Sequence, residues 1–400
     1  MGKASLLMVL GFSLVFAIVS PSLNRTANRS TENYLHYVKI TQAHDIATSA
    51  ANIAANQVFL DPKWRSGYTD VPFSGGKFDV SAQNYGTNQI KIIATGEFES
   101  YQQNVTVILQ PSSFAKFAYY SKVEGSINWI TGDTIWGPFH TQAKMNIPWP
   151  NSPVFYGKVS TLLGTNPKKN LAKFYGGYQS GVNLDLPGDI SGTVNAAKSS
   201  GRVFATGNLW LTFNLNNVTW KTSATGTETT EPLSTFASNG VILVEKGNLH
   251  VQGTMRGKAT VCATGSASLG YGNIYIDDDV RYETDPRTAT SNDMLGLVSQ
   301  NNVIVTDNTA NRSDCRIDAS IFCLNGGLTA ENYSTRPLSG TLTLLGGITQ
   351  YQRGAVGTFS GTTLNHGFHK NYRYDDRLMM MSPPAFPLTG SYEIISWLEE

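Results

Sequence analysis

The chain opens with one long apolar block. Met1-Gly2-Lys3 precedes sixteen uncharged residues, 4–19, in which Ser5 and Ser13 alone are polar. A helix of that length reaches about 24 Å at 1.5 Å per residue, short of the roughly 30 Å of a bilayer core. The block is therefore marginal for spanning and typical of a secretory hydrophobic segment. Since Ala17-Ile18-Val19 is a poor cleavage site, the pattern favours an uncleaved anchor over a removed signal.

A buried helix of a soluble protein is the alternative interpretation of residues 1–20. Lys3 lies before the block, and Arg25 and Arg29 lie after it. Flanking positive charge marks the cytoplasmic side, so these opposed charges do not settle the orientation. We expect export because the rest of the chain has the composition of an extracellular protein.

The segment 21–62 predicts a second, amphipathic helix over residues 32–60. Ser30 or Thr31 is suited to cap it, and Asp61-Pro62 ends it. Its apolar residues recur at three- and four-residue steps, namely Leu35, Val38, Ala43, Ile46, Ala50, Ile53 and Ala54. The alanines permit close approach of a neighbouring helix, so packing on this chain's own β structure and packing between subunits both remain open.

Strand patterns replace helix patterns beyond residue 63. Residues 70–110 alternate between apolar and polar positions, with turns at Gly75-Gly76 and Gly86. This predicts a small antiparallel sheet module over 63–112.

The segment 113–364 consists of short apolar stretches separated by Gly, Asn or Asp. Two related copies, 247–251 and 272–276, begin 25 residues apart and share a Gly-Asn start. Such a period predicts an imperfect parallel β-helix, or β-solenoid, with a β-sandwich as the alternative. The fold class is therefore mainly β, with an N-terminal helix and a C-terminal cap.

The cap is predicted over 365–400. This segment holds large aromatic side chains, charged residues that can pair, and a proline-rich stretch at 383–387. A solenoid needs its last coil covered, or the exposed edge would pair with other chains. A carbohydrate-binding aromatic surface is the alternative. Its aromatic residues are Tyr372, Tyr374, Phe386 and Trp397.

Composition sharpens this picture. Charged residues make up 15% of the 400 residues, the net charge is +1, and the chain contains 38 Gly, 40 Thr and 31 Asn. Uncharged Thr and Asn can stack from coil to coil without repulsion. No positive field exists to hold a phosphate backbone, so nucleic acid is excluded as a partner.

Three cysteines cannot form a disulfide framework. Cys262, Cys315 and Cys323 lie in strand-like apolar contexts that predict buried thiols. A bond between Cys315 and Cys323 remains open in an exported protein.

Few residues suggest site chemistry. The acids Asp277, Asp278, Asp279, Asp285 and Asp293 resemble calcium ligands in type, but they do not have the spacing of an EF-hand. Consecutive acids on a strand point to opposite faces, which favours a solvated turn.

The histidines are no stronger as site candidates. His366 and His369 have the spacing of a helical metal pair, but Gly367 argues against a helix there. His140 is interpreted as a hydrogen-bonded turn residue. No catalytic, cofactor-binding or metal residue is assigned, and no cofactor is predicted.

Several motifs resemble those of a known group. They are GDTIWGPFHTQ (132–142), SPVFYGKVST (152–161), NIYIDDDVRYETDP (273–286), MLGLVSQNNVIV (294–305) and the chain end from 354 to 397. Together they resemble uncharacterised bacterial surface proteins, labelled pilus-assembly or minor-pilin-like, that carry a pilin-like helix and a β-solenoid-like domain. Gly2 stands where prepilin peptidase would cut, although the Glu usual at the fifth mature position is missing. The resemblance implies a cell-surface setting and no activity.

Three functions follow for comparison. The first is a non-enzymatic exported surface protein of the cell envelope, anchored in the membrane through residues 4–19. Other pilin-like subunits and surface glycans remain open as its partners. The second is a polysaccharide-active enzyme that uses Asp277, Asp279, Asp293 and Arg281. The third is a glycan-binding adhesin with Trp129, Trp136 and Trp149 on its surface.

Overall fold

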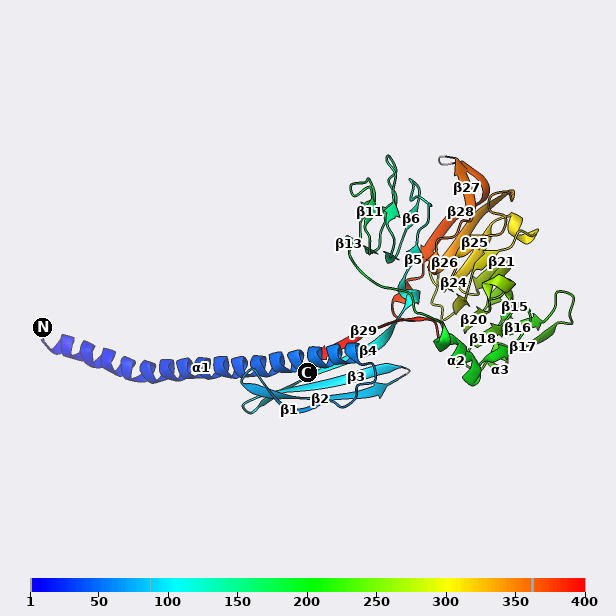
Figure 1. Cartoon of the computed structure of the whole chain (residues 1–400). Coiled ribbons are helices and arrows are strands. Elements are labelled where there is room, and N and C mark those ends of the chain that lie inside the picture. Colours follow the sequence, from blue (N-terminus) through cyan, green and yellow to red (C-terminus); the bar gives the residue numbers. More distant parts are fainter. Residues whose placement is uncertain (1, 87, 361–362, 400) are drawn as a thin grey trace. The chain divides into compact units, whose positions relative to one another are not determined.

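The computed structural model describes residues 2–86, 88–360 and 363–399. It contains two compact units (Figure 1). The first unit takes the described residues up to Pro111 together with those from Ser391 on, and the second spans Ser112–Gly390. The second unit is therefore an insertion between two segments of the first.

The first unit begins with one uninterrupted helix, α1 (Gly2–Leu60), which includes Pro21. The predicted break between an anchor and a second helix beginning near residue 32 is wrong. Thr31 lies inside the helix, and its hydroxyl donates to the Ala27 carbonyl oxygen at 3.0 Å, four residues back. A threonine that bonds in this way continues a helix instead of capping it. The end of α1 at Leu60 agrees with the stop predicted from Asp61-Pro62.

Burial divides α1 into two parts. Its side chains are exposed from residue 2 to residue 38, so the predicted apolar positions Leu35 and Val38 have nothing to pack on within the described chain. Ile53 is also exposed. The buried face begins at Ala43 and consists of Ala43, Ile46, Ala47, Ala50, Ala51, Ala54, Ala55 and Val58.

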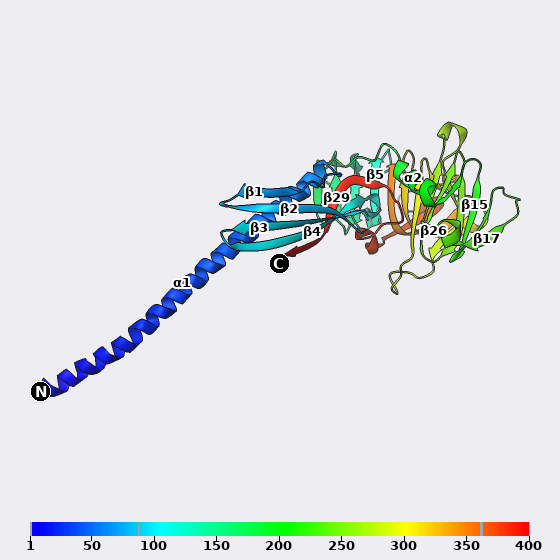
Figure 2. The same ribbon diagram turned by 90° about the horizontal axis from the view of Figure 1, so that it is seen from below.

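A five-stranded sheet packs on this buried face, in the order β1-β2-β3-β4-β29. Figure 2 shows the first four strands running beside the second half of α1. Neighbouring strands from β1 to β4 are antiparallel, as predicted. The strands are β1 (Tyr68–Phe73), β2 (Gly76–Tyr85), β3 (Gln89–Phe98), β4 (Tyr101–Ser113) and β29 (Leu388–Glu399).

Small residues bring this helix and sheet close together. A Cβ atom on Gly96 of β3 would lie 2.2 Å from the Ala43 carbonyl oxygen and 2.4 Å from the Ala47 nitrogen. The alanine pattern that suggested close helix packing is thus explained by contact with this chain's own sheet.

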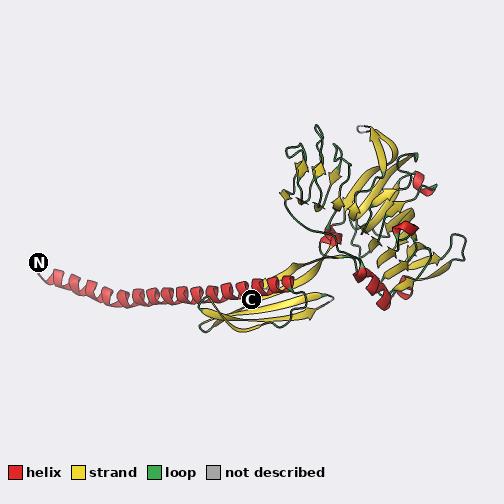
Figure 3. Ribbon diagram, viewed as in Figure 1, coloured by secondary structure: helices red, strands yellow, loops and turns green. Residues whose placement is uncertain are grey.

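The second unit is dominated by strands, which Figure 3 shows in yellow. Most of its pairings are parallel and form two ladders. Successive passages of the chain add one strand to the first ladder and then one to the second. The first ladder consists of β14 (Arg202–Phe204), β18 (Val241–Glu245), β20 (Lys258–Thr264), β22 (Met294–Ser299), β24 (Cys315–Cys323) and β26 (Leu338–Gln352). The second consists of β15 (Leu209–Leu215), β19 (Leu249–Met255), β21 (Ile274–Tyr282), β23 (Val303–Val305) and β25 (Leu328–Ala330).

The ladders enclose one apolar core, which runs from Leu209 to Phe368 along the chain. Two antiparallel extensions flank them, one next to β15 and one next to β28. Their strands are β16 (Asn217–Lys221), β17 (Thr229–Pro232), β27 (Gly357–Ser360) and β28 (Thr363–Tyr374). The unit is mainly β and mostly parallel, but a regular solenoid coil stays a prediction.

A shorter region, residues 119–180, repeats about every twenty residues. Thr134 pairs with Val154, Phe139 with Val159, and Met145 with Thr165, all in parallel. Its strand β5 pairs with β26 and so joins this region to the first ladder. The strands are β5 (Tyr119–Val123), β6 (Thr134–Ile135), β7 (Phe139–Thr141), β8 (Met145–Asn146), β9 (Val154–Phe155), β10 (Val159–Thr161), β11 (Thr165–Asn166), β12 (Lys173–Phe174) and β13 (Tyr178–Ser180).

Short helices complete the unit. Two are α-helical and the others are single 3₁₀ turns. They are α2 (Ser191–Ser200), α3 (Leu233–Phe236), η1 (Phe114–Lys116), η2 (Ala267–Leu269), η3 (Ala310–Arg312) and η4 (Asp376–Met379).

An asparagine ladder explains the repeated Gly-Asn pattern. The side-chain oxygen of Asn208 accepts the backbone N–H of Asn248 at 3.0 Å, and Asn248 does the same for Asn273, also at 3.0 Å. Asn273 in turn accepts from Asn302, and Asn302 from Gly327, each at 3.1 Å. Each amide satisfies a backbone donor of the next strand passage, so Asn is needed at these turns for its hydrogen bond.

The chain end departs from the predicted single cap over 365–400. Residues of β28 join the second unit through β26, whereas β29 pairs within the sheet of the first unit. Phe386 and Tyr374 are buried in the second unit, and Trp397 packs on the core of the first. A pattern of aromatic residues does not reveal which sheet each strand will join.

The three cysteines are buried free thiols, as their apolar contexts indicated. A Cys315–Cys323 disulfide is ruled out because the two residues form the opposite ends of strand β24. Eight steps of about 3.3 Å place them roughly 26 Å apart.

Candidate functional site: an aromatic and cationic cavity

Several of the acids singled out in the sequence have partners of their own. Asp277 forms an ion pair with His250 at 2.9 Å. Asp279 binds Arg281 and accepts the backbone N–H of Arg316 at 2.6 Å. Among the described residues no three His, Cys, Asp or Glu side chains converge as metal ligands would.

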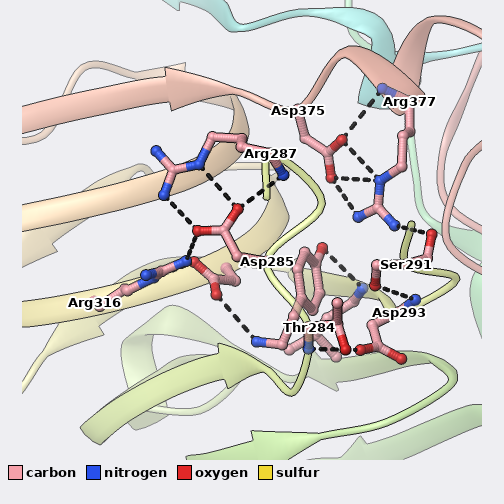
Figure 4. Close-up of polar contacts among 11 residues, drawn as sticks. Thr284, Asp285, Arg287, Ser291, Asp293, Arg316, Asp375 and Arg377 are labelled. Carbon is pink, nitrogen blue, oxygen red and sulfur yellow. Dashed lines mark hydrogen bonds and ion pairs between the residues drawn. The ribbon is translucent and has the colours of Figure 1, made fainter. Parts of the chain in front are cut away.

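Asp285 belongs to an ion-pair network in the second unit (Figure 4). Its carboxylate binds Arg287 at 2.6 Å and Arg316 at 2.8 Å. Arg287, with help from Arg316, holds the pKa of Asp285 well below its usual range. Arg316 also binds the buried Asp318 at 2.8 Å. Each acid here is fixed by an arginine, which suits a structural clamp.

Asp293 and the chain end form the second half of Figure 4. The carboxylate of Asp293 accepts the backbone N–H groups of Gly257 at 2.8 Å and Thr284 at 3.2 Å. Nearby, Asp375 binds Arg377 at 2.6 Å, and Arg377 donates to the Ser291 carbonyl oxygen at 2.8 Å. This pairing of Asp375 with Arg377 agrees with the charge pairing expected from the sequence.

These contacts bear on the enzyme hypothesis. Asp293 serves as a buried cap for backbone donors, whereas Asp279 and Arg281 line a shallow groove on another part of the unit. A glycosidase needs one carboxyl group with a raised pKa beside a second, free carboxylate. Asp279 is paired with Arg281, and Asp293 accepts backbone N–H groups, so neither serves as a free carboxylate.

The histidines are also accounted for. The Nδ1 atom of His366 lies 3.0 Å from the Arg336 carbonyl oxygen, and His369 contacts the ring of Phe359. His140 is fully buried, and its Nδ1 atom lies 2.8 Å from the Ser160 hydroxyl. It is hydrogen-bonded as expected, but it lies in strand β7 and not in the predicted turn.

The strongest candidate site is a cavity of about 240 Å³ within the second unit. Residues 129–136 form one wall, and residues of β26, β28 and the loop between them form the other. Its side chains are mainly aromatic or charged: Tyr119, Trp129, Asp133, Trp136, Arg353, Lys370, Tyr372 and Arg373.

A buried ion pair forms the floor of this cavity. Arg353 donates to Glu124 at 3.1 Å, and both side chains are almost fully buried. Glu124 also accepts from Tyr119 at 3.0 Å and from the Trp129 indole at 2.9 Å. Because so many donors converge on Glu124, the charge of Arg353 is balanced within the protein.

Arginines cover the two tryptophan rings of the cavity. The guanidinium of Arg353 lies 4.0 Å from the Trp129 ring centroid, and that of Arg373 lies 4.4 Å from the Trp136 centroid. Trp136 continues into a stack of exposed rings, with Tyr156 at 4.3 Å and Tyr175 beyond it. These contacts fix the direction of both arginines.

Lys370 differs from the other cations. Within the described residues its ammonium group has neither a hydrogen bond nor an ion pair, although it lines the cavity. Burial, strengthened by the nearby charge of Arg353, lowers the pKa of Lys370 to about 8. The site thus holds a cation whose hydrogen-bonding capacity the protein leaves unused.

The adhesin hypothesis named three tryptophans, of which two belong to this cavity. Trp129 is buried in the floor, and Trp136 is 44% exposed at the edge. Trp149 is exposed and does not line the cavity. Arg353 and Lys370 were missed because they lie more than 200 residues after the tryptophans. Glu124 is only five residues before Trp129, but no local motif connects the two.

Among the described residues, α1 is the one helix that is long and apolar enough to cross a membrane, by length and composition. None of its most apolar window is buried. An exposed apolar N-terminal helix of this kind is pilin-like and is consistent with membrane anchoring.

No protein-family model and no curated protein sequence matches the chain. Among solved structures, the chain is similar to the competence-associated pilin ComZ from Thermus thermophilus, with 11% sequence identity and a TM-score of 0.41. The similarity covers 90% of this chain and 97% of that one.

Proposed function

We propose that the protein is a non-enzymatic, pilin-like surface protein, anchored through residues 4–19 with its β units exported from the cytoplasm. The observation that carries this proposal is the complete exposure of α1 from residue 2 to residue 38. Side chains such as Leu7, Leu10 and Phe16 are 60–72% exposed, although burying each in an apolar medium is worth about 1.5–3 kcal/mol. A bilayer supplies that medium for the apolar block.

The tyrosine-rich part of α1 supports the pilin-like aspect. Tyr34, Leu35 and Tyr37 of α1 are exposed at 66%, 50% and 67%. Outside the membrane, such side chains are suited to pack against α1 of another subunit. Assembly through this helix is part of the proposal, as is the absence of an activity.

We also propose that the two ladders are the faces of an imperfect β-solenoid that the cell displays. The alternation of strands between the ladders and the asparagine ladder at the turns support this reading. An experimental structure with closed, stacked coils is the test, and a sandwich of two independent sheets would contradict it.

Membrane fractionation tests the anchor. We expect the full chain in the membrane fraction after alkaline carbonate washing, with the β units cleaved when protease is added to spheroplasts. Leu10→Glu combined with Val15→Glu should release the chain, because each charge in a bilayer costs roughly 2.5–3.5 kcal/mol.

The matched control is Asn24→Glu combined with Asn28→Glu, which adds the same charge on the exposed polar part of α1. This variant should stay in the membrane fraction. Recovery of the unaltered chain as a soluble cytoplasmic protein would contradict the proposal.

A further inference from the structure

We propose that the aromatic and cationic cavity binds the carboxylate group of an acidic sugar, a uronate, at Lys370. This inference goes beyond the proposed surface role and does not depend on where the chain resides. It is carried by the cavity's shape, its unbalanced charge and its aromatic walls.

The shape is that of a small-molecule site with room to extend. The cavity of about 240 Å³ shares Gly132, Asp133, Gly354 and Lys370 with a neighbouring cavity of about 470 Å³. Together they fall in the range of roughly 300–1,000 Å³ common for ligand sites. Lys370 lines both cavities.

The charge pattern selects an anion with a single charge. Arg353 is paired with Glu124, and the Asp133 carboxylate accepts the backbone N–H of Ile130 at 2.9 Å. Among the described residues, Arg373 has one polar side-chain partner, Asn371 at 3.2 Å. Three cations therefore face two acids, which leaves one positive charge in excess.

Lys370 carries that excess at an energetic cost. Its side chain is partly shielded from water and has no acceptor among the described residues, which destabilises the charged form. A ligand carboxylate beside Lys370 would remove this cost and accept a charge-assisted hydrogen bond from its ammonium group. An unpaired cation in a cavity therefore indicates where an anionic group binds.

The walls favour a sugar over a bare anion. Tyr372 and Trp136 both line the cavity, and the Trp136 ring lies under the guanidinium of Arg373. The Tyr372 hydroxyl has no hydrogen-bond partner among the described residues and is suited to bind a sugar hydroxyl. In small-molecule sites, a small number of polar groups among aromatic side chains orient the ligand.

Tryptophan fluorescence titration of the full chain in detergent is the test, since Trp129 and Trp136 both line the cavity. The probes are D-glucuronate and D-galacturonate, with glucose, galactose and inorganic phosphate as comparisons. We expect saturable binding of a uronate that is at least about tenfold tighter than binding of its neutral counterpart or of phosphate.

Lys370→Met should weaken uronate binding by about tenfold or more, the effect of losing one charged hydrogen bond. The variant should melt at the same or a higher temperature than the unaltered protein, because it removes an unpaired, partly buried charge. This separates lost binding from lost folding.

Lys168→Met is the matched control, because Lys168 is an exposed lysine outside the cavity, and its binding should change by less than about twofold. The proposal is overturned if no uronate binds, if neutral sugar or phosphate binds as tightly, or if Lys370→Met leaves uronate affinity unchanged. Failure of membrane fractionation would leave these results unaffected, so the two proposals fail separately.

Discussion

His140 shows how a single residue can set the acid limit of the second unit. Its ring is stacked on Tyr120 at 5.3 Å, and its Nε2 atom is buried without a hydrogen-bond partner among the described residues. Burial lowers the pKa of His140 to about 4. The folded protein therefore holds the neutral ring well below the pH at which an exposed histidine gains a proton.

This predicts an acid-dependent loss of stability. The unfolded chain binds a proton at His140 near its ordinary pKa of about 6.5, whereas the folded chain does not. The stability that His140 contributes is therefore complete above about pH 6.5 and is lost as the pH falls toward 4. Thermal unfolding should show that the free energy of unfolding falls between pH 7 and pH 4.5. We expect this fall to be smaller in His140→Gln than in the unaltered protein, by about 1–3 kcal/mol.

The control is His36→Gln, at an exposed position of α1. In this variant the free energy of unfolding should fall with pH as much as in the unaltered protein. Equal pH dependence of His140→Gln and the unaltered protein would show that His140 can take up a proton in the fold.

At the scale of elements, the asparagine ladder joins strand passages that are otherwise connected by irregular turns. Asn273 is 7% exposed. Its backbone N–H donates to the side-chain oxygen of Asn248, and its own side-chain oxygen accepts the backbone N–H of Asn302. Removing its amide leaves the backbone N–H of Asn302 without an acceptor. An unsatisfied buried donor costs about 1–3 kcal/mol.

Asn273→Ala should therefore lower the free energy of unfolding of the second unit by about 1–3 kcal/mol in urea titration. Asn195→Ala, at an exposed position of α2, is the control and should change it by less than about 0.5 kcal/mol. A similar small change in both variants would mean that the ladder bonds add no stability.

Elements also show what could be predicted from the sequence. The antiparallel strands over 70–110 and the stop of α1 before Asp61-Pro62 depend on local patterns, and the structure agrees with both. The continuous helix through Pro21 and Thr31 was missed because local cap signals do not tell whether the flanking turns remain helical. The Gly-Asn copies indicated a repeat, but not the hydrogen bond behind it.

The candidate site was accessible to sequence reasoning only in part. The sequence indicated Trp129 and Trp136 as candidate binding residues because they are aromatic. Their place in the cavity, however, is shared with Arg353 and Arg373, which lie more than 200 residues later. The β5–β26 pairing joins these segments, and nothing local specifies that pairing. Lys370 is a candidate because its ammonium group has no hydrogen bond or ion pair among the described residues. No sequence pattern can reveal such a missing partner.

At the scale of the whole molecule, the second unit is inserted with its ends adjacent. The Phe114 N–H donates to the Pro387 carbonyl oxygen at 3.0 Å, and the Thr389 hydroxyl donates to that of Ser112 at 3.2 Å. The chain therefore leaves β4 and returns to β29 at one place. A short turn can connect those points without stretching either strand.

Replacing residues 114–386 with Asn-Gly should leave a first unit that unfolds cooperatively, as followed by circular dichroism in detergent. Removing β29 as well should lower its melting temperature, because Tyr392 and Trp397 pack on the core beneath that sheet. A shortened chain without a cooperative transition would show that the first unit requires the second to fold.

The exposed stretch of α1 has a consequence for clearance from the lipid surface. With residues 4–19 in the bilayer, residues 20–35 separate the apolar block from His36, whose ring contacts Tyr101 of β4. Sixteen residues of helix are roughly 24 Å long, whereas the headgroup layer is about 5–8 Å thick on each side. The sheet of the first unit therefore stands beyond the headgroups on a rigid spacer, and its outer face can remain polar because it never meets lipid.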